Sequence, residues 1–208
     1  MKLVTSANHT VEVMAVAPMD NNIYLLTDHA SGDSLLIDCA NDSAGILDFV
    51  RTRRVTRIVT THRHADHLGA LAQVSAALQV PAYSGVDDLK AIQDATGVYQ
   101  YPLADGEIFQ VGKTPVHVTQ LVGHTPGSIA LTIYPDGHPP VIFTGDSLFP
   151  GGVGKTWSDA DFTRLLDDVV TKIFAVLPDE TIVLPGHGKA TTIGAERGSI
   201  DQWRARGW

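Results

Sequence analysis

The chain has 208 residues but only one cysteine, Cys39, and no long apolar run. A single cysteine excludes a disulfide within the chain, and no stretch approaches the roughly 18 apolar residues of a membrane-spanning helix. The only apolar stretch near the N-terminus contains Glu12, which is unlike the core of a signal peptide. We therefore expect a soluble, cytoplasmic protein without a membrane partner, in which Cys39 is a small buried hydrophobe.

Charged residues are also sparse, at 18% of the chain, and the formal net charge is -8. The lysines and arginines are scattered, apart from a small group at Arg51, Arg53, Arg54 and Arg57. A protein whose main partner is nucleic acid usually presents a basic stripe. We therefore expect no nucleic-acid partner.

Apolar periodicity divides the chain into short strands and amphipathic helices, which we assign to one domain over residues 1–208. Strands are predicted at 11–16, 23–27, 35–38, 57–61, 80–84, 107–112, 115–122, 128–135, 140–146 and 181–186, with Asp20, Asn21 and Asn22 as a turn. Helices are predicted at 44–54, 68–78, 87–95, 158–173 and 194–203. Two groups of strands, each followed by helices, indicate two packed sheets with helices outside, or a mixed α/β sheet.

The segment TTHRHADHLGA, residues 60–70, places ionisable side chains where a predicted strand gives way to a helix. Alternate residues of an extended backbone share a face, so His62, His64 and Asp66 can point the same way. His67 projects elsewhere as the chain turns into the helix. One strand end can therefore supply ligands to two adjacent metal sites, which other parts of the chain must complete.

Three further candidates stand at the ends of predicted strands: His124 in LVGHTPGS, Asp146 in IFTGDSLF and His187 in VLPGHGK. Glycine or turn residues flank each of them, which lets backbone approach a ligand closely. The absence of cysteine ligands argues against a closed structural zinc site. Five histidines and two aspartates are too many for one tetrahedral ion. We therefore predict two divalent ions, zinc first, with iron or manganese as alternatives.

These motifs together resemble the signature of the metallo-β-lactamase fold superfamily. THRHADH is similar to its His-x-His-x-Asp-His motif, and GHTPGS, TGDSLF and PGHG follow in the same order, over roughly residues 21–189. The resemblance implies an α/β fold, a four-layer αβ/βα sandwich, with a binuclear site at the edge of the sheets. It also implies that one ion is held by His62, His64 and His124, the other by Asp66, His67 and His187, with Asp146 as the bridge.

Within that superfamily the chain is most similar to glyoxalase II, a hydroxyacylglutathione hydrolase, in the segments GHTPGS and GDSLFPGGVGK. The resemblance implies a small-molecule thioester as the substrate, with Lys155 and Trp157 near its thiol part. True β-lactamases usually have a cysteine where Asp146 stands, so we do not expect antibiotic hydrolysis. Only 21 residues follow His187, so we expect most of the helical C-terminal extension of glyoxalase II to be absent. The identity of the thiol carrier therefore stays open.

The resemblance implies that two ions lower the pKa of a bridging water and so give a hydroxide that attacks the substrate carbonyl. Asp66 and Asp146 are the predicted catalytic carboxylates. A phosphate-binding loop at GGVGKT is excluded, because that motif requires a glycine where Phe149 stands. Three alternatives remain: a lactone or ester hydrolase on the same site, a mononuclear iron persulfide dioxygenase, and a metal-dependent binding module.

Overall fold

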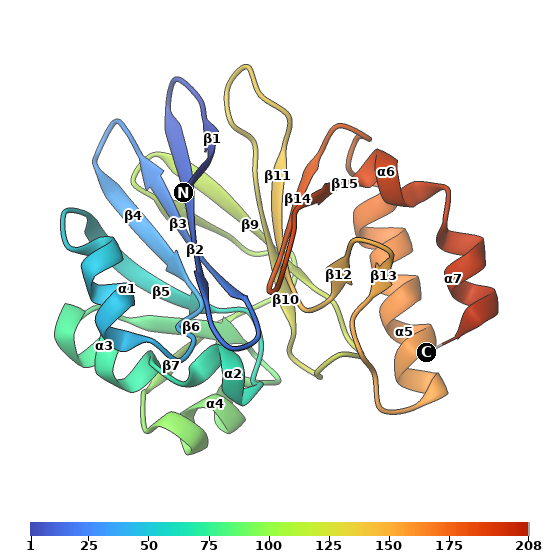
Figure 1. Cartoon of the computed structure of the whole chain (residues 1–208), viewed down its shortest axis with the longest axis horizontal. Helices are drawn as coiled ribbons and strands as arrows, with labels where there is room; N and C mark the ends of the chain where they lie inside the picture. The colour runs from blue at the N-terminus through green and yellow to red at the C-terminus, as the bar shows by residue number, and fades with distance from the viewer. Residues whose placement is uncertain (208) are drawn as a thin grey trace.

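Two β-sheets pack face to face in the computed structural model, which describes residues 1–207 (Figure 1). The first sheet holds seven strands in chain order: β1 (Lys2–Thr5), β2 (His9–Val16), β3 (Asn21–Asp28), β4 (Asp33–Ile37), β5 (Arg54–Thr60), β6 (Ala82–Gly85) and β7 (Gln100–Leu103). Strands β1 to β4 pair antiparallel. Strands β4 to β7 pair parallel, because helical crossover connections return the chain to the same end of the sheet before each new strand. These connections contain α1 (Ser43–Val50), α2 (Ala65–Leu68), α3 (Leu71–Leu78) and α4 (Leu89–Thr96).

The second sheet has six strands in the spatial order β15 (Thr191–Thr192), β14 (Ile182–Pro185), β11 (Val141–Gly145), β10 (Ile129–Ile133), β9 (Thr114–Gln120) and β8 (Ile108–Val111). A small hairpin, β12 (Leu148–Phe149) and β13 (Gly152–Val153), stands beside it. The outer face is covered by α5 (Asp159–Asp168), its continuation η1 (Val169–Phe174), α6 (Ile193–Arg197) and α7 (Ile200–Arg206) (Figure 1).

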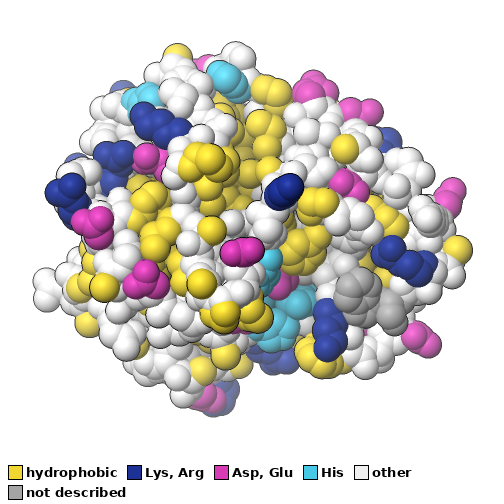
Figure 2. Space-filling model, in the orientation of Figure 1, with side chains coloured by type: hydrophobic (Ala, Val, Ile, Leu, Met, Phe, Trp, Pro, Cys, Tyr) yellow, Lys and Arg dark blue, Asp and Glu magenta, His cyan; other side chains and the backbone are white. Residues whose placement is uncertain are grey.

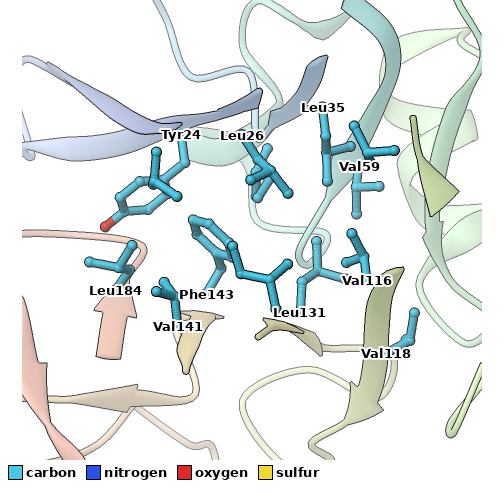
Figure 3. Packing of buried hydrophobic residues seen from close by; sticks show 14 of the residues in the cluster. Tyr24, Leu26, Leu35, Val59, Val116, Val118, Leu131, Val141, Phe143 and Leu184 are labelled. Atoms are coloured by element: carbon cyan, nitrogen blue, oxygen red, sulfur yellow. The ribbon is translucent and has the colours of Figure 1, made fainter. Parts of the chain in front are cut away.

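Alternation along the strands explains why each sheet is covered on both faces. In β3, Tyr24 and Leu26 point into the core between the sheets, while Ile23 and Leu25 pack under the first group of helices. In the second sheet, Phe143 and its neighbours meet Tyr24 across the central core (Figure 3). The helix–sheet–sheet–helix arrangement confirms the predicted four-layer αβ/βα sandwich.

The predicted helix at 158–173 begins and packs as its sequence indicates. Ser158 caps it, since the Ser158 hydroxyl accepts a hydrogen bond from the Asp161 backbone N–H. The apolar face lies in the core under the second sheet, with Leu165 and Val169 fully buried. After Asp168 the helix widens into the π-helical turn η1, where Ala175 N donates to Val170 O.

Several predicted boundaries were wrong. The helix at 44–54 ends at Val50, and Arg54 already starts β5. The helix at 68–78 is interrupted, because α2 ends at Leu68 and α3 begins at Leu71, and that at 194–203 consists of two short helices. Asn21 and Asn22 belong to β3 and are buried, not part of a turn. No helix within residues 1–207 is long and apolar enough to cross a membrane.

Candidate metal centre

The end of β5 delivers the first group of candidate ligands. The chain stays extended at His64 and turns into α2 at Ala65, three residues before the predicted start of the helix at 68–78. His62 and His67 are buried, and their ring centroids lie 4.3 Å apart. Asp66 and His67 both stand on the single turn of α2. The prediction that Asp66 shares a face with His62 and His64 was therefore wrong, because the chain is already helical at Asp66 and its carboxylate lies with His67 and His187. One short segment therefore serves two neighbouring groups of ligands.

Three other strand ends complete these groups. His124 follows β9, Asp146 follows β11 and His187 follows β14. The structure brings all seven predicted ligands together in three overlapping groups, within each of which the ligand atoms lie within 4.8 Å of one another. The groups are His62, His64 and His124; His62, His67 and Asp146; and Asp66, His67 and His187.

Asp146 lies between the two halves of the cluster. Its Oδ1 is 3.4 Å from Nε2 of His67, and its Oδ2 is 3.4 Å from Nε2 of His187 and 3.7 Å from Nε2 of His124. On the far side, Oδ2 of Asp66 is 3.2 Å from Nε2 of His187. A carboxylate in this position can contact both groups at once.

Hydrogen bonds outside the cluster fix the orientation of four imidazole rings. In each case Nδ1 faces an oxygen, which leaves Nε2 to face the centre of the cluster. The Nδ1 partners are Thr61 Oγ1 for His62 (3.1 Å), Asp38 Oδ2 for His67 (2.9 Å), the Lys155 carbonyl for His124 (2.7 Å) and the Met19 carbonyl for His187 (2.8 Å). The rings are thus held in place from outside.

The electrostatics divide the histidines into two kinds. Burial lowers the pKa of His62, His64 and His124, so these rings are neutral and can donate a lone pair. Burial also disfavours the charged form of His67, but the carboxylates of Asp38 and Asp146 outweigh it and raise the pKa to about 10. His187 likewise reaches a pKa of about 10, because Asp146 and Asp66 outweigh its burial.

Buried ligand atoms without hydrogen-bond partners indicate that these residues fit a divalent metal ion. Among the described residues, Nε2 of His62, Nε2 of His124 and Oδ1 of Asp146 are buried side-chain atoms without a hydrogen-bond partner. An unpaired buried polar atom costs about 1–3 kcal/mol, so three in one cluster need a common explanation. Coordination of a cation explains all three. Imidazole nitrogens and carboxylate oxygens are suitable ligands for zinc, iron and manganese.

A cleft of about 460 Å³ opens over this cluster. Its lining includes His124, Asp146 and His187, the glycine-rich stretch 149–155 and Arg206 of α7. Figure 2 shows the histidines at the surface between the two halves of the molecule, with basic side chains beside them. The cluster is therefore open to a small molecule from solvent.

Of the two predicted substrate-binding residues, Lys155 lines this cleft. Trp157 lines a neighbouring cleft of about 180 Å³ beside His124 and is 67% exposed. The Lys155 Nζ lies 4.6 Å from the centroid of the Trp157 ring, a cation–π contact. Among residues 1–207, neither Lys155 nor Arg206 forms a salt bridge with a carboxylate; Lys155 contacts the Trp157 ring and Arg206 the Gly151 carbonyl.

Sequence reasoning missed four residues around the site. Asp38 contacts His67, the Asn21 side chain donates to Asp66 Oδ2 at 2.9 Å, and Asp88 contacts both histidine-bearing loops. Arg206 reaches the cleft from α7. The position of Asp38 as the last residue of LLID, directly after β4, was a usable signal, since it matches the placement of the other candidates at strand ends. Asn21, Asp88 and Arg206 offered none, because their contacts join distant segments.

Comparisons with known proteins agree with this geometry. The family model described as "Metallo-beta-lactamase superfamily" matches residues 16–187. An uncharacterised protein of Aquifex aeolicus is 31% identical over 200 residues, covering 90% of this chain and 93% of the relative. Hydroxyacylglutathione hydrolase GloC of Haemophilus influenzae is 27% identical over 207 residues, covering 91% and 95%.

Solved structures show the same fold. ETHE1 from Myxococcus xanthus superimposes with a TM-score of 0.78 at 26% identity, covering 94% of this chain and 84% of that one. BLEG-1 B3 metallo-beta-lactamase gives 0.75 at 27% identity, covering 90% and 96%. TTHA1623 in a di-iron-bound form gives 0.70 at 29% identity, covering 89% and 96%. The family model and the Aquifex relative both span most of the chain, and the chain therefore belongs to the metallo-beta-lactamase superfamily.

Proposed function

We propose that the protein is a hydrolase that uses two divalent metal ions to cleave a small-molecule thioester. His62, His64 and His124 would hold one ion, and Asp66, His67 and His187 the other, with Asp146 between them. The observation that carries the proposal is the cluster of three buried, unpaired ligand atoms on His62, His124 and Asp146. Zinc is the first candidate. The di-iron-bound TTHA1623 supports iron as an alternative.

When bound, two such ions would lower the pKa of a water between them and polarise the carbonyl group of the substrate. The side chains of the chain itself prepare the site for this chemistry. Hydrogen bonds from His187 and Asn21 keep the pKa of Asp66 well below its usual range, so that its carboxylate stays ionised at neutral pH. The neutral imidazoles of His62 and His124 accept a cation without first releasing a proton.

The walls of the cleft favour an anionic substrate. Lys155 and Arg206 both line it, and the ring of Trp157 supports the Lys155 ammonium group. The guanidinium of Arg206 is close to the glycine stretch, where its Nη2 donates to the Gly151 carbonyl at 3.3 Å. Two cations beside a reactive centre suit a thiol or acyl group that carries a carboxylate.

A thioester is preferred over an oxygen ester for two reasons. A thiolate leaves without needing much protonation. The similarity to a relative named hydroxyacylglutathione hydrolase points to the same bond. Lactones and oxygen esters remain the alternative substrates of this site.

Thiol release from S-D-lactoylglutathione by the zinc-loaded chain tests the proposal. We expect turnover that a chelator abolishes and that Asp66→Ala lowers by at least about 100-fold. Asp94→Ala is the control, because Asp94 forms an exposed pair with Lys90 on α4. If the protein binds zinc but releases no thiol from thioesters of glutathione, coenzyme A or cysteine, thioesters are excluded. Lactone opening in the same assay would then support the ester alternative.

A persulfide dioxygenase is the second candidate, because the same ligand types accept iron. It resembles this chain in HADH and GHT. Iron-loaded protein supplied with glutathione persulfide in an oxygen electrode separates the two activities. Oxygen uptake without thioester cleavage would replace the hydrolase proposal, and thioester cleavage without oxygen uptake would support it.

A further inference from the structure

Asp88 is a buried aspartate at the start of α4 whose side chain does not cap that helix. It stands at the N-cap of α4, where an aspartate normally accepts a hydrogen bond from the first turn of its helix. Here the Asp88 side chain makes no capping hydrogen bond. The residue is nevertheless fully buried. A buried carboxylate needs several hydrogen-bond donors, so the donors around Asp88 indicate its structural role.

Those donors come from the two loops that carry His62, His64 and His124, hereafter the three-histidine group. The backbone N–H of Arg63, between His62 and His64, donates to Asp88 Oδ2 at 3.0 Å. The hydroxyl of Thr125, the residue after His124, donates to the same oxygen. The backbone N–H of Gly127 donates to Oδ1 at 3.0 Å. One carboxylate therefore joins the loop of His62 and His64 to the loop of His124.

The packing around this junction leaves little freedom for either loop. A Cβ at Gly127 would lie 2.2 Å from the Asp88 backbone nitrogen, and a Cβ at Gly85 would lie 2.1 Å from the Gly127 carbonyl oxygen. The GHTPGS loop thus rests directly on the start of α4 because two glycines allow it. The Asp66–His67–His187 group is contacted by different residues, Asp38 and Asn21.

We propose that Asp88 is the positioning residue of the three-histidine group and sets the distance between His62, His64 and His124. It acts through backbone and hydroxyl donors, with Nε of Arg63 3.7 Å from its Oδ1, and it is not one of the candidate ligands. The inference rests on the proposed metal centre but not on the identity of the substrate. It predicts a selective effect: loss of the Asp88 carboxylate weakens one ion site and spares the other.

Zinc affinity of the full chain in two backgrounds tests this selectivity. His187→Ala leaves the three-histidine group as the intact site, and His124→Ala leaves the Asp66–His67–His187 group. Competition with a chromophoric chelator gives the zinc affinity in each. Adding Asp88→Asn should weaken zinc binding about 10–100-fold in the His187→Ala background. It should change the affinity less than about twofold in the His124→Ala background.

Asp87→Asn is the matched control, since the neighbouring Asp87 is exposed and accepts a hydrogen bond from the Gln120 side chain, away from both histidine-bearing loops. It should change neither affinity. If Asp88→Asn does not fold, Thr125→Val and Thr125→Ser provide a second test. Valine removes one donor to Asp88 and should weaken zinc binding in the His187→Ala background, while serine keeps the hydroxyl and should restore it.

Equal losses in both backgrounds would show that Asp88 supports the fold in general and would overturn the inference. No loss in the His187→Ala background, or equal behaviour of the valine and serine variants, would also overturn it. A wild-type chain that binds no zinc, iron or manganese would instead remove the proposed metal centre. The two failures are therefore distinguishable.

Discussion

The Oδ2 atom of Asp38 lies 2.9 Å from Nδ1 of His67, and both side chains are buried. Asp38 adopts a left-handed backbone conformation, with φ of 63°, which few residues other than glycine favour. The same carboxylate accepts hydrogen bonds from the backbone N–H and the hydroxyl of Thr61. Asp38 thus joins the end of β4 to the end of β5 and orients the His67 ring.

Replacement of Asp38 by asparagine should weaken zinc binding at the Asp66–His67–His187 group about 10–100-fold. The cause is loss of the carboxylate that orients the His67 ring. The metal-free protein should also lose about 1–3 kcal/mol of stability, because a buried hydrogen-bond network is broken. Chelator competition and denaturant unfolding measure the two effects. Asp94→Asn should change neither, and an unaltered zinc affinity in Asp38→Asn would show that ring orientation does not limit binding.

The metal-free protein should become less stable as the pH rises from about 6.5 to 10. The pKa of His67 and that of His187 rise from 6.5 to about 10 on folding. Groups with a raised folded pKa contribute stability that is complete below the unfolded pKa and lost as the pH passes the folded one. The lowered pKa values of Asp66 and Asp146 predict a second loss as the pH falls below about 3.8.

Thermal unfolding in the presence of a chelator measures this profile. The zinc-loaded protein should not show the loss between pH 6.5 and 10, because metal binding already requires neutral His67 and His187. The variant His187→Ala should show a smaller decline than the wild type in the metal-free state. A flat profile for the metal-free wild type would contradict the assigned protonation of these two histidines.

Removal of either cation from the cleft should impair binding of an anionic substrate. Lys155→Ala and Arg206→Ala should each raise KM about 10-fold or more, the usual effect of losing a charge-assisted hydrogen bond. A matched substrate with its carboxylates esterified should show little change. Arg204→Ala is the control, since Arg204 pairs with Asp167 on the surface. Equal effects on charged and neutral substrates would show that the cations have a structural role only.

The backbone at Gly154 should tolerate no side chain. A Cβ there would lie 1.7 Å from the Asp146 carbonyl oxygen and 3.4 Å from Nδ1 of His124. Gly154→Ala should therefore displace two predicted ligands, lower the zinc content and cost about 1–3 kcal/mol of stability. Gly198→Ala is the control, because no atom lies within 4 Å of the added Cβ. Metal analysis and unfolding measure both effects, and normal zinc content in Gly154→Ala would contradict the close approach.

Much of the site could be predicted from sequence because its chemistry depends on local geometry. His62 and His64 follow from the alternation of an extended segment, and His124, Asp146 and His187 from glycine-flanked strand ends, but Asp66 lies with His67 on the turn of α2, where alternation did not place it. The residues that hold these ligands could not be predicted in the same way. Asp88 lies inside a predicted helix and Asn21 in a predicted turn. Their real roles arise from contacts between segments 25 to 45 positions apart in sequence.

The secondary-structure elements also divide into those that the sequence predicted and those that it did not. Short apolar runs predicted β3, β9, β10 and β11 closely, because β3, β10 and β11 are buried along nearly their whole length and β9 on alternate positions. The short edge strands β1, β7 and β15 were missed, because at most half of the residues in each are buried. The break between α2 and α3 at Gly69 was also missed. A Cβ at Gly69 would lie 2.1 Å from the Asn41 side-chain oxygen, a contact between distant segments.

The metal content of three proteins tests the central claim most directly. Wild type, His124→Ala and His187→Ala should be loaded with zinc, freed of excess ion by gel filtration and analysed for zinc per chain. The account predicts about two ions in the wild type and about one in each variant, because each substitution removes a ligand from a different group. One ion or none in the wild type, or an unchanged content in either variant, would contradict it.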